Sequence, residues 1–374
     1  MKRILFLLFL IPFLVSLPEN KKSGDVLTFT PPLTGIIDGM VNIHGVKNDT
    51  TLSPPSLNPG DWEILNDGKP VVHHSQTVGE RKIDPVGFYL TENNLALFYN
   101  SGWDNYDRWF ELRDERGYAG STNQAGSLIA FNDNWNIKDY HDNPVFDQPQ
   151  RKWQGRNRTN PYALVWHPVH EMFYCFYGDF AEGGDNDLYP GRRALGLAKS
   201  SDLVNWEYLT VDEPLFHIQD MYDFHPETFE GLNHTRSGRV YAFGAVYYDG
   251  WIYMQVGGSA DGQNYTFVIR SRNADRGWEF VGIPEHRPMA IPYKGKWYTP
   301  RNIRDPKDSD KRAIGIVVND SPISSGSPEY IFSTGYSSSA GVSRQLFMFN
   351  GRWHVAYRQS DEDDNRSMYI ARQK

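Results

Sequence analysis

Two acidic residues stand directly before apolar stretches of the sequence and are candidates for acid–base chemistry. Asp84 lies in IDPVGF and Glu230 in FEGLNHTRSGRVYAF. An Asp before Pro commonly opens a turn, so Asp84 also has a structural interpretation. A Glu at the start of a buried strand is unfavourable unless it has a functional role, which favours a role for Glu230. Glu227, in HPETFEG, is the alternative candidate for the same role. One protonated and one ionised carboxyl group at a fixed separation can act as general acid and general base.

Arginine and histidine side chains form a second set of candidates. Arg301 and Arg304 lie in TPRNIRDP, and Arg344 lies in GVSRQLF. Planar guanidinium groups can bind a carboxylate or a sulfate through two hydrogen bonds. Salt bridges to the many surface acids are the alternative for each arginine. His225 and His286 occupy comparable loop positions, where they could contact a ligand, a structural ion or only solvent.

Aromatic residues and the single cysteine complete the candidates. Trp103, Trp109, Trp153 and Trp251 would suit stacking on a flat ligand, although many of the 11 Trp must belong to the core. Cys175 in MFYCFY fits a small buried apolar residue and can form no intramolecular disulfide. No spacing of His, Asp or Glu indicates a metal site. We expect no cofactor, with a structural ion left open.

The elements that must hold these residues repeat along the chain. Hairpin patterns begin at Ile83 and Thr159, each with a polar-Pro step, an apolar strand, a polar turn and an aromatic strand. Each is followed by an apolar strand, an Asn/Asp/Ser turn, a Trp and a Pro-led apolar close. Three further hairpins place innermost strands near 230, 289 and 344, after those near 84 and 160.

Five four-stranded units predict an all-β, five-bladed β-propeller. The sequence shows no helical pattern of any length, which excludes α/β barrels and doubly wound sheets. The last unit ends one strand short at SMYIARQK, and residues 56–72 carry the same turn, Trp and Pro-apolar close. We therefore expect this N-terminal segment to complete the last blade and close the ring. The repeated Trp should pack between neighbouring blades.

Composition and the N-terminus limit the classes of partner. The chain has 374 residues and a net charge of −8, which argues against sequence-independent binding of nucleic acid or anionic membranes. Residues 1–17 contain two basic residues followed by an apolar run, as in a signal peptide. The run is too short to span a membrane. We predict a signal peptide at 1–17, an extension at 18–55 and one propeller domain at 56–374. The mature chain would be secreted or periplasmic and not inserted in a membrane.

The blade pattern resembles that of a known superfamily. AKSSDLVNWEYL is similar to the blade signature of the five-bladed propeller glycosidases, which comprise glycoside hydrolase families 32, 43, 62, 68, 117 and 130. The resemblance runs from about Asp61 to the C-terminus and is strongest between Asp84 and Phe280. It assigns no single family.

The resemblance implies an axial pocket with carboxylates at the starts of the first three innermost strands. In the family 43 pattern these are a general base, an Asp that tunes the acid, and a Glu in a Glu-Gly step as general acid. The first falls on Asp84 and the third on Glu230, whereas the second falls on Asn160. An amide can hold a substrate hydroxyl but lacks the charge that keeps a nearby acid protonated.

The resulting hypothesis is an exported glycoside hydrolase that uses Asp84 and Glu230 on an oligo- or polysaccharide. Substrate contacts would come from Asn160, Arg301, Arg344, His225 and Trp103, and the arginines would bind an acidic sugar. A non-catalytic carbohydrate-binding propeller is the alternative, because Asn160 stands where an Asp is expected. Another acid, such as Asp179 or Asp223, could also replace it.

Overall fold

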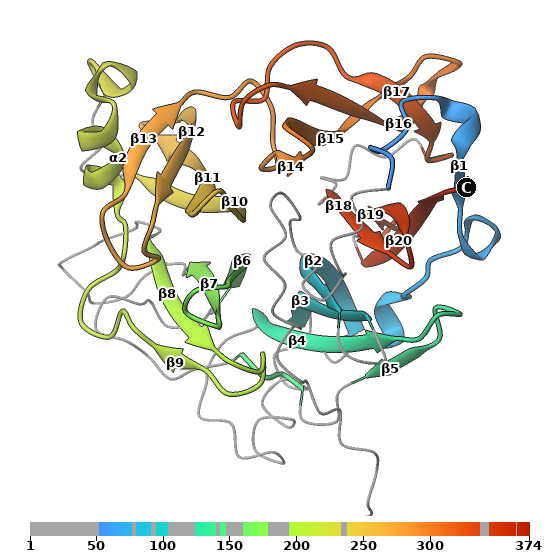
Figure 1. Ribbon diagram of the computed structural model, residues 1–374, viewed down its shortest axis with the longest axis horizontal. Helices are drawn as coiled ribbons and strands as arrows, with labels where there is room; N and C mark the ends of the chain where they lie inside the picture. Colours follow the sequence, from blue (N-terminus) through green and yellow to red (C-terminus); the bar gives the residue numbers. More distant parts are fainter. Residues whose placement is uncertain are drawn as a thin grey trace, which may run out of the picture.

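The protein is a ring of five β-blades around a central axis (Figure 1), and the strands within each blade pair antiparallel. The structure, a computed structural model, describes residues 52–76, 80–90, 95–103, 124–139, 143–146, 160–178, 194–232, 238–336, 344–363 and 365–374. The predicted signal peptide and most of the predicted extension lie outside these residues. Within the described ranges, no helix is both long enough and apolar enough to span a membrane.

Each blade has four strands, and its first strand lies nearest the axis in all five blades (Figure 1). Blades I and II contain β2 (Glu80–Leu90), β3 (Leu95–Trp103), β4 (Gln124–Phe131) and β5 (Ile137–Asp139), then β6 (Asn160–His167), β7 (Met172–Gly178), β8 (Leu195–Ser200) and β9 (Glu207–Tyr208).

The remaining blades follow the same order along the chain. Blades III and IV contain β10 (Arg239–Tyr248), β11 (Trp251–Ala260), β12 (Gln263–Ser271) and β13 (Glu279–Gly282), then β14 (Ile291–Tyr293), β15 (Lys296–Asp305), β16 (Asp308–Asn319) and β17 (Glu329–Ser333). Blade V contains β18 (Arg344–Phe349), β19 (Arg352–Ser360), β20 (Arg366–Gln373) and, from the N-terminal side, β1 (Trp62–Ile64).

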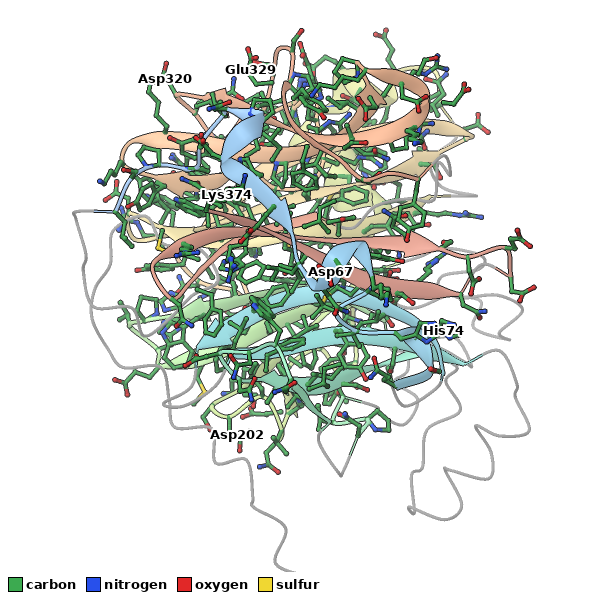
Figure 2. The ribbon with its side chains drawn as sticks, turned by 90° about the vertical axis from the view of Figure 1, so that its right-hand side faces the viewer. Asp67, His74, Asp202, Asp320, Glu329 and Lys374 are labelled. Atoms are coloured by element: carbon green, nitrogen blue, oxygen red, sulfur yellow. The ribbon has the colours of Figure 1, made fainter. Side chains whose placement is uncertain are left out.

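The predicted ring closure is confirmed. β1 pairs antiparallel with β20 through Trp62 and Gln373, and Val72 bridges to Met368 farther along the same strand. The last residue, Lys374, lies beside the segment that holds β1 (Figure 2), and its amide donates to the carbonyl of Asp61 at 2.8 Å. The last blade is therefore built from both ends of the described chain.

One predicted innermost strand was placed wrongly. The third was expected near residue 230, but β10 begins at Arg239. Residues before it form the short helix α2 (Ile218–Phe224) and the 3-10 helix η4 (Pro226–Phe229). A capping box between His217 and Asp220 starts α2, so the sequence contained a local helix signal that the strand pattern obscured.

Aromatic pairs fill the space between adjacent blades, which explains the high aromatic content. Each of the five interfaces between blades has at least one pair of aromatic rings. The distances between ring centroids are 4.1 Å for Phe88 and Phe347, 4.7 Å for Tyr89 and Phe173, 5.7 Å for Phe176 and Trp278, 5.2 Å for Tyr253 and Trp297, and 5.7 Å for Phe332 and Tyr357. Such pairs contribute about 0.5–1.5 kcal/mol beyond their buried area.

The repeated Trp side chains pack on the preceding blade, as predicted. The ring centroid of Trp62 lies 6.1 Å from that of Phe332, that of Trp135 lies 5.4 Å from that of Phe349, and that of Trp206 lies 5.5 Å from that of Phe98. In blade II, Asp202 shapes the turn before the Trp by accepting hydrogen bonds from the amides of Val204 and Asn205. The repeated sequence is thus a packing device and belongs to the ring rather than to a site.

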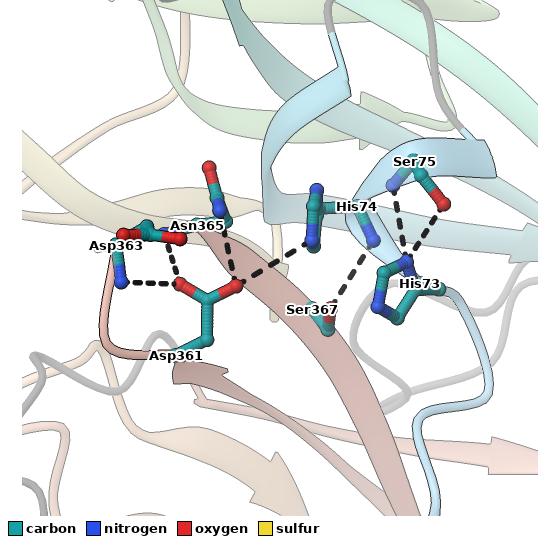
Figure 3. A network of polar contacts seen from close by, with 7 residues as sticks. All are labelled: His73, His74, Ser75, Asp361, Asp363, Asn365 and Ser367. Carbon is teal, nitrogen blue, oxygen red and sulfur yellow. Dashed lines mark hydrogen bonds and ion pairs between the residues drawn. The ribbon is translucent and has the colours of Figure 1, made fainter.

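A polar network lies where the N-terminal segment meets blade V (Figure 3). His74, in the 3-10 helix η3 (His74–Gln76), places its Nε2 at 3.5 Å from Asp361 Oδ2, and its amide donates to Ser367 Oγ at 3.1 Å. Asp361 precedes β20 and accepts hydrogen bonds from Asn365. We call His74, Asp361, Asn365 and Ser367 the closure network.

Candidate functional site

A cavity of about 560 Å³ lies at the ring axis, and every blade contributes to its lining. Blades I to V provide, among others, Asp84, Asn160, Tyr241, Arg301 and Gln345. This volume is within the range of pockets that bind small organic ligands. We call it the axial pocket.

Backbone irregularities at the innermost strands direct side chains into the axial pocket. The pairing register shifts between Pro85 and Gly87 in β2 and between Pro161 and Ala163 in β6. Proline within a strand is tolerated at such bulges because it has no amide hydrogen to donate. The Asp-Pro and Asn-Pro steps of the sequence are therefore the positions at which the strands turn polar side chains toward the axis.

Asp84 is held by two arginines of blade V. Arg358 Nη1 donates to Asp84 Oδ1, and Arg366 Nη1 lies 3.6 Å from Asp84 Oδ2. The Asp84 side chain is 14% exposed and that of Arg358 is 15% exposed. Two neighbouring guanidinium groups favour the ionised carboxylate over the neutral acid. We call Asp84, Arg358 and Arg366 the Asp84 side of the pocket.

Asn160 begins β6 and is buried, with 7% of its surface exposed. Its Oδ1 accepts a hydrogen bond from Nδ2 of Asn100, which lies opposite Asp84 on β3. Asn100 is also buried, and its Oδ1 has no hydrogen-bond partner among the described residues. A buried amide oxygen without a partner is costly, so a ligand hydroxyl or a water at this point would be stabilising.

The structure does not bring Glu230 to the cavity that Asp84 lines. Glu230 is exposed at the end of η4, before β10 begins, and Glu227 is exposed as well. In blade III the position that matches Asp84 and Asn160 is Tyr241, which directly precedes the bulge between Ala242 and Ala245. Among the described lining residues, Asp84 is the one carboxylate.

Arg301 reaches the axial pocket from β15, together with Arg287 from the segment before β14. Arg301 Nη1 donates to the carbonyl of Arg287 at 3.0 Å. The Arg287 guanidinium lies 4.1 Å from the centre of the Phe243 ring and donates from Nε to Thr266 Oγ1 at 2.9 Å. We call Arg287, Arg301 and Phe243 the Arg301 side of the pocket.

The other predicted contacts lie elsewhere or outside the described part of the chain. His225 follows α2, shares a hydrogen bond with Thr228 Oγ1 at 3.0 Å and packs on Phe280, so it does not line the axial pocket. Arg304 is exposed on β15, and Asp223 is an exposed acceptor for Gln219.

Several predicted residues have side chains that the structure does not describe. Arg344 begins β18 and Trp103 ends β3, but neither side chain is described. Asp179, Trp109 and Trp153 lie wholly outside the described residues. Their predicted roles therefore stay predictions.

The sequence analysis missed three arginines of the axial pocket. Arg287 had a usable signal, because Arg287-Pro288 repeats the polar-Pro step of blades I and II. Arg358 and Arg366 had none, since their contact with Asp84 exists only when the ring closes. Over the described ranges, no group of three or more His, Cys, Asp or Glu side chains is arranged to hold a metal ion.

Comparison with known proteins finds similarity in structure only. No family model matches the chain, and no curated protein matches it significantly. A glycoside hydrolase structure is 11% identical with a TM-score of 0.51, over 80% of this chain and 89% of that chain. A Parabacteroides distasonis protein provisionally assigned as a glycoside hydrolase is 11% identical with a TM-score of 0.50, over 83% of this chain and 96% of its own.

The sequence identity to both structures is low, at 11%. Identities this low show a shared fold and do not transfer an activity. The predicted resemblance is confirmed at that level: the chain shares its five-bladed propeller with structures of glycoside hydrolases.

Proposed function

We propose that this protein is a glycoside hydrolase that holds a carbohydrate in the axial pocket and uses Asp84 as an ionised carboxylate. The observation that carries the proposal is the position of Asp84, which lies in a cavity of about 560 Å³ where all five blades meet. The fold shared with glycoside hydrolase structures agrees with it. Pockets of this size with a few convergent polar groups are the usual binding sites of folded enzymes.

The environment of Asp84 decides which catalytic role it can take. Glycoside hydrolysis needs a protonated carboxyl group at the leaving oxygen and an ionised carboxylate that activates water or attacks the sugar. Because Arg358 and Arg366 favour the charged form of Asp84, it suits the second role and not the first. The predicted acid, Glu230, does not line the axial pocket, so the geometry leaves the proton donor unassigned.

The remaining lining is suited to a sugar ring. Tyr162 and Tyr241 contribute aromatic rings to the axial pocket, with centroids 5.6 Å apart. Aromatic faces bind the C–H faces of sugars, while the unpartnered Oδ1 of Asn100 can accept a hydrogen bond from a sugar hydroxyl. In this proposal Asn160 fixes the orientation of Asn100.

A non-catalytic carbohydrate-binding propeller is the second candidate. It is favoured by one observation: Asp84 is the single carboxylate among the described lining residues. Asn160 stands where the resemblance implies a second one. Such a protein would bind sugar without forming product.

Turnover and binding assays separate the two candidates. The mature chain and its Asp84→Asn variant would be screened on oligosaccharides by release of reducing ends, with binding measured by calorimetry. Asp320→Asn is the matched control, because Asp320 is 83% exposed and outside the axial pocket. Cleavage that Asp84→Asn abolishes supports the hydrolase. Binding without cleavage by the unaltered chain would leave only the binding propeller, and cleavage by Asp84→Asn at the unaltered rate would contradict the role of Asp84.

Export is part of the proposal and rests on residues 1–17. We expect the chain to be found outside the cytoplasm without its first residues. N-terminal sequencing of the protein purified from its host tests this, and recovery of an intact Met1 would contradict it.

A further inference from the structure

The charge of the axial pocket is opposite to that of the whole chain. Its described lining includes four arginines, Arg287, Arg301, Arg358 and Arg366, against one carboxylate, Asp84. The full chain carries a net charge of −8. A positive cavity in an acidic protein attracts anions, because the cavity walls focus the local field.

The four arginines differ in what neutralises them. Arg358 and Arg366 face Asp84. On the opposite side, Arg301 has no carboxylate partner within the described residues, and it donates a hydrogen bond to the neutral carbonyl of Arg287. Its Nε is buried and has no acceptor among those residues. Arg301 is thus a cation with donor capacity that the described residues leave unused.

Arg287 increases the positive charge at the same place. It donates hydrogen bonds to uncharged acceptors, Thr266 Oγ1 and the carbonyl of Tyr265, and its guanidinium stacks on Phe243. Burial lowers the pKa of both Arg287 and Arg301, and the charge of Arg301 lowers that of Arg287 further. Both arginines are half-buried, and an anion bound beside Arg301 would offset the repulsion between the two like charges.

The two arginines also separate the axial pocket from a second cavity. This cavity, of about 520 Å³, lies between blades III and IV and is lined by Arg287, Arg301, Thr228, Asn264 and Glu285 among others. Glu285 is exposed and accepts a hydrogen bond from the amide of Gly326 at 2.9 Å. An anion bound by the arginines would therefore lie at the border of both cavities.

We propose that the Arg301 side of the axial pocket binds the anionic group of an acidic carbohydrate, a uronate carboxylate or a sulfate ester. The arrangement offers guanidinium donors for the anion beside aromatic rings for the sugar, as planar anions and sugar faces require. This inference rests on the proposed function, because it names the substrate class for the same pocket.

The first test measures binding and needs no catalysis. Calorimetry would compare neutral, uronate and sulfated oligosaccharides in gluco, galacto and manno series, with the unaltered chain and with Arg301→Gln, Arg301→Lys and Arg304→Gln. We expect the acidic members of one series to bind best, and Arg301→Gln to weaken them by roughly 10- to 100-fold. Arg301→Lys should restore part of the affinity, since it keeps the charge but loses the planar fork. Arg304 is on the same strand but exposed, so Arg304→Gln should bind the acidic sugars within about twofold of the affinity of the unaltered chain.

The outcomes distinguish this inference from the proposed hydrolase. Preference for uronate over sulfate, or the reverse, identifies the anion. Neutral sugars that bind or are cleaved as well as acidic ones would overturn the inference and leave the hydrolase standing. Acidic sugars that bind through Arg301 without being cleaved would support the inference and contradict the hydrolase. Failure of every series to bind would overturn both.

Discussion

The two sides of the axial pocket use the same residue type in opposite settings. On the Asp84 side, Arg358 and Arg366 surround a carboxylate and complete an ion-pair cluster within the protein. On the Arg301 side, Arg287 and Arg301 contact carbonyl, hydroxyl and aromatic groups. The first arrangement holds a charged group in place, while the second leaves capacity for an anion from outside. An arginine in a pocket therefore indicates an anionic ligand only when the protein does not already neutralise it.

The largest effect is expected from Asp84→Asn. The change removes the one carboxylate of the described lining but keeps its shape, so activity on the cleaved sugar should fall by about 10²–10⁴-fold. Rates of reducing-end release measure this. The variant should also bind acidic sugars at least as well as the unaltered chain, because one negative charge is removed from the pocket. Weaker binding of acidic sugars by Asp84→Asn would argue against that part.

A smaller effect is expected on stability from Arg358→Met. It removes one of the two arginines that contact Asp84, whose side chain is 14% exposed, and we expect a loss of about 2 kcal/mol in the free energy of unfolding. Denaturant unfolding measures the change. The double variant Arg358→Met/Asp84→Asn should recover part of it, since the carboxylate that lost Arg358 is then replaced by a neutral amide. If Arg358→Met and the double variant have equal free energies of unfolding, the stability of Arg358→Met does not depend on the ion pair with Asp84.

A fall in pH should weaken the contribution of the closure network to stability. Two of its residues, Asp361 and Asn365, lie just before Arg366 of the Asp84 side. Burial would raise the pKa of Asp361, but hydrogen bonds from Asn365 and the charge of His74 lower it below 3.8. A lowered folded-state pKa contributes stability above the ordinary Asp value and loses it as pH falls through the folded value. The contribution should be no more than about 1 kcal/mol, because the side chain is 46% exposed.

The matched pair Asp361→Asn and Asp202→Asn tests this prediction. Both carboxylates shape turns through backbone hydrogen bonds, but Asp202 lies in blade II, away from the axial pocket. Unfolding curves at pH 3 and pH 6 should show that Asp361→Asn loses less stability on acidification than the unaltered chain does. Only Asp361→Asn should also reduce kcat/KM slightly, through the turn that leads to Arg366. An equal loss of activity in both variants would show that the closure network does not affect the pocket.

The smallest effect is expected from Arg301→Met without ligand. Because Arg301 forms no ion pair within the described residues, its removal should change the free energy of unfolding by less than about 0.5 kcal/mol. Thermal unfolding of this variant beside Arg358→Met gives the comparison directly. A large loss for Arg301→Met would show that Arg301 holds the fold together and is not reserved for a ligand.

Repeated local patterns made most of the fold predictable. Hairpins with polar-Pro steps placed the innermost strands of blades I and II, and the repeated Trp placed residues 56–72 in the last blade. The error at Glu230 arose where a helix interrupted the repeat: α2 and η4 separate the Glu-Gly step from β10. A capping pattern that begins at His217 is a local signal, but it competed with a stronger expectation of a strand.

The site was predictable only where a residue belongs to the repeat. Asp84, Asn160 and Arg301 line the axial pocket, because they lie on the first or second strand of their blades, near the axis. Their predicted roles stay predictions. The ion pairs of Asp84 were not predictable, since Arg358 and Arg366 lie at the other end of the chain and meet it only through ring closure. The contact of Arg301 with Arg287 was not predictable either, since its Nη1 donates to a backbone carbonyl of another segment.

The pairing of β1 with β20 has a consequence for how the molecule is made. A ribosome releases β1 long before its partner β20, so blade V stays incomplete until β20 has been made. Until then β1 lacks its strand partner, and Asp84 lacks Arg366. Assembly of the pocket thus waits for β20, and chains that stop short of Arg366 would leave unsatisfied strand edges for proteases or other chains to bind.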